Sequence, residues 1–108
     1  MNIEWANANY TGGGLYTYIG KLKNGNYFMA ADDWNDKDES FVYEVDSEVV
    51  FDEFEEGDPA PWAIEWMYEH VIKRHSTEAF KEILEWIITN EPDGNYDTEE
   101  LNRRLRRL

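Results

Sequence analysis

The chain lacks cysteine, lacks any long hydrophobic run and has few basic residues. Without cysteine, disulfides, zinc–thiolate sites and cysteine nucleophiles are excluded. No apolar run approaches the ~20 residues that a membrane-spanning helix needs. The first ten residues, MNIEWANANY, have neither the basic start nor the apolar stretch of a signal peptide. These absences predict a soluble protein of the cytoplasm.

Aromatic residues, by contrast, are abundant, with five Trp, seven Tyr and five Phe among 108 residues. Disordered acidic chains lack such residues, so we expect one folded domain over residues 1–108. A domain of this length buries roughly 65% of the surface that its unfolded chain exposes, so it folds without a metal or disulfide staple. We therefore expect no cofactor and no metal.

Negative charge is unevenly distributed along the chain. The formal net charge is −14, from 24 acidic and ten basic residues. Residues 32–58 hold thirteen acids and only Lys37, whereas residues 101–108 hold four arginines and no acid. Such an excess opposes binding to nucleic acid or anionic membranes and favours a basic protein partner.

Residues 15–54 predict an antiparallel β-meander of about four strands. Asn24-Gly25 favours a two-residue type I′ turn, which pairs Leu22 with Tyr27 and Ile19 with Ala30. In that register Phe28 shares a sheet face with Ile19. Residues 41–45 (FVYEV) and 48–54 (EVVFDEF) alternate as strands do.

Two or three helices are expected to follow, near residues 61–74, residues 77–89 and the last ten residues. Pro59 or Pro61 suits a helix start, and Asp97 with Glu100 fits a capping box. Strands followed by helices indicate an α+β domain in which the meander packs on the helices. The expected core includes Ile19, Phe28, Tyr43, Phe51, Trp66, Phe80, Leu84 and Ile87.

The acids of residues 41–58 are interleaved with strand-forming residues, and no base lies among them. Alternate strand residues are ~6.6–6.8 Å apart on one face, about twice the ~3.4 Å rise per nucleotide of a DNA strand. Solubility alone also explains acids on a strand, but a surface of that kind usually mixes both signs. We predict a partner-binding surface of Glu44, Asp46, Glu48, Asp52, Glu53, Glu55 and Glu56, with Asp32, Asp33, Asp36 and Asp38 as a second tier.

The whole chain, and the stretch DDWNDKDESFVYEVDSEVVFDEFEEGD above all, resembles in type the small acidic anti-defence proteins of phages and mobile elements. These include anti-CRISPR and anti-restriction DNA mimics. The resemblance implies a non-enzymatic inhibitor that fills the nucleic-acid-binding surface of a nuclease or defence effector. It transfers no role to any single residue, and the basic NRRLRR end departs from a uniformly acidic mimic.

Two alternatives remain open. The same electrostatics suit an immunity or antitoxin protein that neutralises a toxic nuclease. A small calcium-binding module is the other, because Asp93, Asn95, Asp97 and Glu99 are spaced like the first ligands of an EF-hand loop. Thr98 and Arg104, however, replace the glycine and the bidentate glutamate of that loop. No nucleophile or metal-ligand motif indicates an enzyme.

Overall fold

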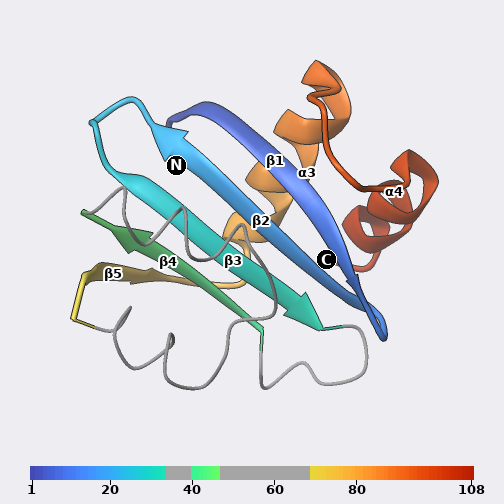
Figure 1. Ribbon diagram of the computed structural model, residues 1–108, viewed down its shortest axis with the longest axis horizontal. Helices are drawn as coiled ribbons and strands as arrows, with labels where there is room; N and C mark the ends of the chain where they lie inside the picture. The colour runs from blue at the N-terminus through green and yellow to red at the C-terminus, as the bar shows by residue number, and fades with distance from the viewer. Residues whose placement is uncertain (34–39, 47–68) are drawn as a thin grey trace.

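A computed structural model describes residues 1–33, 40–46 and 69–108. In these ranges the chain forms a five-stranded antiparallel sheet in the order β1-β2-β3-β4-β5, together with two helices (Figure 1). The elements are β1 (Ile3–Gly12), β2 (Leu15–Leu22), β3 (Tyr27–Asp33), β4 (Phe41–Val45), β5 (Val71–His75), α3 (Ala79–Asn90) and α4 (Thr98–Arg106). The α+β class and the meander are confirmed, but the sheet has five strands where about four were predicted.

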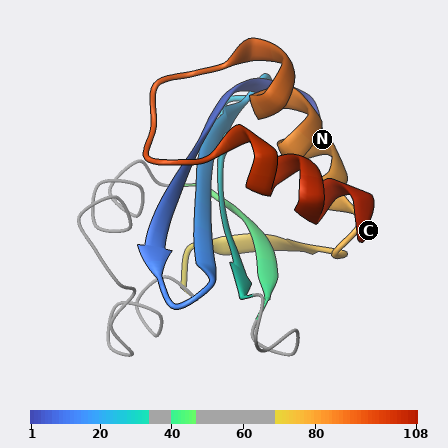
Figure 2. The ribbon, with the colours of Figure 1, turned by 90° about the vertical axis from the view of Figure 1, so that its right-hand side faces the viewer.

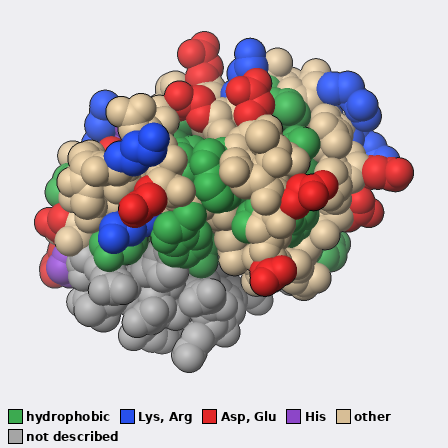
Figure 3. All heavy atoms as spheres, turned by 90° about the horizontal axis from the view of Figure 1, so that it is seen from above, with side chains coloured by type: hydrophobic (Ala, Val, Ile, Leu, Met, Phe, Trp, Pro, Cys, Tyr) green, Lys and Arg blue, Asp and Glu red, His purple; other side chains and the backbone are tan. Residues whose placement is uncertain are grey.

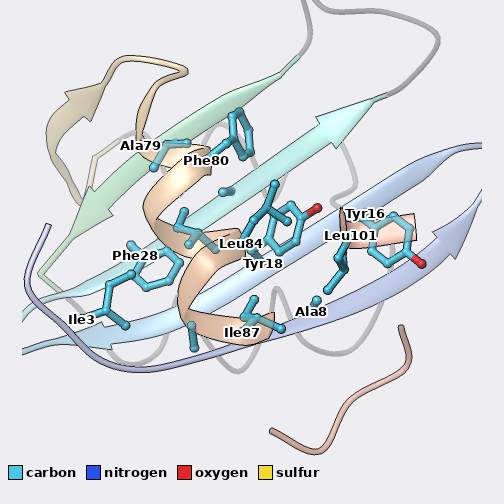
Figure 4. Packing of buried hydrophobic residues seen from close by; sticks show 14 of the residues in the cluster. Ile3, Ala8, Tyr16, Tyr18, Phe28, Ala79, Phe80, Leu84, Ile87 and Leu101 are labelled. Carbon is cyan, nitrogen blue, oxygen red and sulfur yellow. The ribbon is translucent and has the colours of Figure 1, made fainter. Parts of the chain in front are cut away.

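Both described helices lie on one side of the sheet (Figure 2). The apolar stripe of α3, with Phe80, Ile83, Leu84 and Ile87, packs on side chains of β1, β2 and β3, and Leu101 joins it from α4 (Figure 4). The predicted helix at 77–89 and the predicted C-terminal helix are therefore confirmed. Since most helix stability in proteins comes from burying such a stripe, the sheet and α3 stabilise each other.

The β2–β3 hairpin has a register one residue away from the predicted one. Ile19 pairs with Met29 and Gly20 with Phe28, while the Leu22 N–H donates to the Asn26 carbonyl. The loop therefore has three residues, with Gly25 at a φ of 92°, the left-handed position that closes a three-residue hairpin loop. A slip of one residue exchanges the faces of a strand. Phe28 consequently lies beneath the helices with Tyr18, on the face opposite Ile19.

The two edge strands also differ from the prediction. The sequence predicts no helix or strand over residues 3–12, which form β1. The helix predicted over residues 61–74 is wrong at its end, because residues 71–75 form β5 and pair with β4. Val71 continues the helical spacing of Trp62, Trp66 and Met67 in the sequence, but residues 71–75 instead form backbone pairs along β4. The rest of that predicted helix and the predicted strand at 48–54 lie outside the described residues.

The core prediction is largely confirmed. Five of the eight residues are buried: Ile19, Phe28, Phe80, Leu84 and Ile87. Tyr43 is only half-buried, and it contacts a smaller cluster of Ile19, Met29 and Val45 on the sheet face away from α3. Phe51 and Trp66 lie outside the described residues. No helix in the described ranges is both long and apolar enough to span a bilayer.

Candidate functional site

Four of the eleven acids predicted to bind a partner lie in the described residues. Asp32 and Asp33 end β3, Glu44 lies in β4, and Asp46 follows it. The other seven are outside the described ranges: Asp36, Asp38, Glu48, Asp52, Glu53, Glu55 and Glu56. The structure therefore locates the first two residues of the second tier and the first two of the predicted surface.

Glu44 is a buried carboxylate with a full set of hydrogen bonds. Only 8% of the residue is exposed. Its oxygens accept from Asn24 Nδ2 at 3.2 Å and Asn26 Nδ2 at 2.8 Å, and lie 3.1 Å from His75 Nε2. Burial raises the pKa of this carboxyl, but the hydrogen bonds from Asn26, His75 and Asn24 outweigh it and hold the pKa below its ordinary 4.5. Glu44 ties the β2–β3 turn to β4 and β5 and offers little surface to a partner.

Asp46, in contrast, is exposed, and its Oδ1 lies 3.2 Å from His70 Nδ1. Together with Glu44 and His75, this contact places a histidine against an acid at both ends of β5. Lys73 and Arg74 are exposed on the same strand, and Lys73 pairs in register with Glu44. Sequence reasoning missed this arrangement because it assigned residues 71–74 to a helix. Lys73 and Arg74 give this edge of the sheet a basic border.

Arg104 organises the other end of the sheet. Its side chain is 3% exposed, and its guanidinium donates to the Asp32 carbonyl and Oδ2 at 2.9 and 3.0 Å, to the Gly14 carbonyl at 2.6 Å and to Glu100 Oε1 at 3.3 Å. It also lies 4.6 Å from the centre of the Tyr16 ring. The middle of the NRRLRR segment therefore binds the protein's own acids and backbone.

The Tyr18 hydroxyl lies beneath this cluster. It is buried and has no hydrogen bond of normal geometry to any described residue. Burial, and after it the nearby Asp32 carboxylate, raises the pKa of Tyr18. The phenol therefore stays neutral and adds no charge to the buried Arg104–Asp32 pair.

A pocket of about 360 Å³ opens where β3, α3 and α4 meet. We call it the β3–α3–α4 pocket. Its walls combine apolar side chains with acids and arginines: Asp32, Asp33, Glu78, Phe80, Arg104, Arg107 and Leu108, with Ser40 and Thr77 between them. The volume is within the range of small-ligand sites, and such sites typically join apolar walls to a few polar groups.

Acidic and basic side chains lie close together on one face of the described surface (Figure 3). Figure 3 shows lysine or arginine beside aspartate or glutamate over much of one face. Lys21 pairs with Glu4, and Arg103 with Glu100. By sequence, residues 34–39 and 47–68 hold ten of the 24 acids and only one base, Lys37. Most of the unbalanced charge therefore belongs to those two stretches.

The residues that are spaced like EF-hand calcium ligands make hydrogen bonds to other residues of the protein. Asp97 caps α4 by accepting from the Glu99 N–H at 2.8 Å, and the Asn95 side chain donates to the Tyr10 carbonyl at 3.3 Å. The Asp93 carbonyl accepts from Asn7 Nδ2. Within the described ranges, no three His, Asp or Glu side chains gather as metal ligands would. A turn followed by a helix cap accounts for this segment.

In comparisons with known proteins, no protein-family model, no curated protein and no solved structure matches the chain.

Proposed function

We propose that the chain is a non-enzymatic inhibitor that binds the basic nucleic-acid-binding surface of a nuclease or defence effector. The observation that carries the proposal is the separation of charge within the molecule. The described residues hold 14 acids and nine bases, some of them in ion pairs, while residues 47–68 contain seven acids and no base. An unbalanced acidic segment joined to a folded scaffold is complementary to a basic groove.

The inward position of Arg104 supports the same proposal. The C-terminal arginines were the feature of the sequence that argued against an acidic mimic. The Arg104 guanidinium donates hydrogen bonds to Asp32, Glu100 and Gly14, and Arg103 forms an ion pair with Glu100. Two of the four arginines thus neutralise the protein's own acids and do not oppose a basic partner. The burial of Glu44 removes it from the proposed contact surface, so the acids after β4 carry the proposal.

The test is charge reversal followed by competition. One variant carries Glu48→Lys, Glu53→Lys and Glu56→Lys. A matched variant carries Glu85→Lys, Glu91→Lys and Glu99→Lys, three exposed acids elsewhere on the molecule. A partner captured by the wild-type protein should lose binding to the first variant and largely keep binding to the second. Duplex DNA or RNA should displace the wild-type protein from that partner.

Two results would contradict the proposal. Equal loss of binding in both variants would mean that net charge alone drives association. A partner that holds nucleic acid and this protein simultaneously, with unchanged affinity for each, would mean that the protein binds outside the nucleic-acid groove.

A further inference from the structure

The lining of the β3–α3–α4 pocket combines apolar and charged side chains. Of its apolar residues, Phe80 is buried and Leu108 is 58% exposed. Asp32, Asp33 and Glu78 contribute three carboxylates, against two guanidinium groups from Arg104 and Arg107. Lysine and arginine side chains bury their methylene stems on apolar surface and keep their charged ends among polar groups. The pocket is complementary to that kind of side chain.

Two of the carboxylates have acceptor capacity to spare. Asp32 uses Oδ2 for Arg104, but an ionised carboxylate offers about four acceptor positions, and the Asp32 side chain is 24% exposed. Glu78 lies at the N-terminus of α3, is exposed, and makes no side-chain capping bond there. Both groups can therefore accept hydrogen bonds from an incoming cation.

Arg104 does not turn the pocket into an anion site. Its guanidinium already donates to Asp32, Glu100 and Gly14, and its side chain is 3% exposed. A phosphate entering the pocket would have to break these bonds and approach three carboxylates. A cation finds further acceptor positions on Asp32 and Glu78, and the three carboxylates of the pocket outnumber the two guanidinium groups of Arg104 and Arg107.

We propose that the β3–α3–α4 pocket receives one arginine or lysine side chain of the basic partner, with the cation at Asp32 and Glu78 and the stem on Phe80 and Leu108. The proposal rests on the proposed function, because it deepens the recognition of a basic surface. The pocket would give the protein a binding site formed by folded elements, in addition to the negative charge of residues 47–68. Anchors of this kind, in well-packed pockets, carry much of the affinity in protein interfaces.

The experiment titrates acetyl-arginine amide into the full ¹⁵N-labelled chain and follows its amide resonances. Acetyl-citrulline amide, which has nearly the same shape but no charge, is the control ligand. We expect saturable shifts confined to the amides around Thr77, Glu78 and Leu108, with the arginine compound binding more tightly than the citrulline compound. Glu78→Gln should weaken arginine binding about fivefold, as the loss of an exposed ion pair does, and Glu85→Gln, on the same helix, should leave it unchanged.

A second variant tests the apolar wall. Leu108→Ala should weaken the arginine and citrulline compounds by the same factor, since it removes stem contact and no charge. Equal binding of the two compounds to the wild type, or equal effects of Glu78→Gln and Glu85→Gln, would overturn the proposal. The titration contains no partner protein, so a negative result would overturn the pocket proposal and not the proposed function. A negative charge-reversal test would overturn the proposed function, and binding to the pocket could still be measured.

Discussion

At the scale of single residues, two buried charges join parts of the chain that are distant in sequence. Arg104 links α4 to the β1–β2 turn, to β2 and to β3 through Gly14, Tyr16 and Asp32. Glu44 links the β2–β3 turn to β5. A buried charge is tolerated only where it is paired and hydrogen-bonded, and both residues meet that condition. Glu100 lies four residues before Arg104, but the other partners are between 18 and 90 residues away, so the sequence does not predict either role.

We expect Arg104→Met to destabilise the fold by about 3–5 kcal/mol, the usual cost of removing one partner of a buried ion pair. Asp32 and the Gly14 carbonyl would lose their donors, and a methionine stem cannot replace them. Urea denaturation monitored by tryptophan fluorescence measures the change. Arg103→Met, which affects an exposed ion pair on the same helix, should change stability by less than about 1 kcal/mol. Similar midpoints for the two variants would contradict the buried network.

Glu44 predicts a specific pH dependence of stability. Its pKa is lower in the folded protein than its ordinary 4.5, so folding favours the ionised carboxylate. The resulting stabilisation is fully present above pH 4.5 and is lost as the pH falls through the folded-state pKa. Glu44→Gln should therefore be less stable than wild type at pH 7, and the gap should narrow below pH 4.5. Denaturant midpoints from pH 7 to pH 3 test this; a constant gap would contradict it.

At the scale of elements, sequence predicts best where periodicity and burial coincide. The sequence predicts both the apolar stripe of α3 and the Asp97 cap of α4, because each depends on residues that are close together in the chain. Residues 6–9 (ANAN) of β1 alternate as a strand does, but alanine and asparagine are both depleted in strands, so their composition gives no strand signal. Strand β5 is predicted as helix because Val71 continues the helical spacing of Trp62, Trp66 and Met67. Its partner β4, not its own sequence, makes it a strand.

The hairpin register yields a prediction of its own. A Cβ atom built on Gly20 would lie 2.1 Å from the Phe28 ring and 2.5 Å from the Trp5 carbonyl oxygen. Gly20→Ala should therefore destabilise the protein by about 1–3 kcal/mol through overpacking.

Adding Phe28→Leu should recover part of that loss, because a smaller side chain makes room for the new methyl group. The double-mutant cycle measures this coupling. In the register first predicted, the two residues would lie on opposite faces and their effects would add, so strict additivity would contradict the register described.

At the scale of the whole molecule, the sequence predicts the charge but not its arrangement. The acidic total and its concentration in residues 32–58 follow from counting. The pairing of Arg104 with Asp32 and the β3–α3–α4 pocket do not, because they arise where β3, α3 and α4 come together. The burial of Glu44 does not either, because it depends on the β2–β3 turn and β5. Of the predicted surface, Asp46 is exposed and Asp32 and Asp33 border the pocket. The acids after β4 remain a prediction.

Salt should act in opposite directions on the free protein and on its association with a basic partner. A net charge of −14 repels itself within the fold, so screening by added salt should raise the melting temperature of the free protein. The same screening should slow association with a basic groove, because steering acts over distances comparable to the Debye length, about 30 Å at 0.01 M and about 8 Å at 0.15 M ionic strength. Thermal melts and stopped-flow association across this range measure both. An association rate that stays constant while the melting temperature rises would show that the acidic segment acts on the protein's own stability and not on a partner.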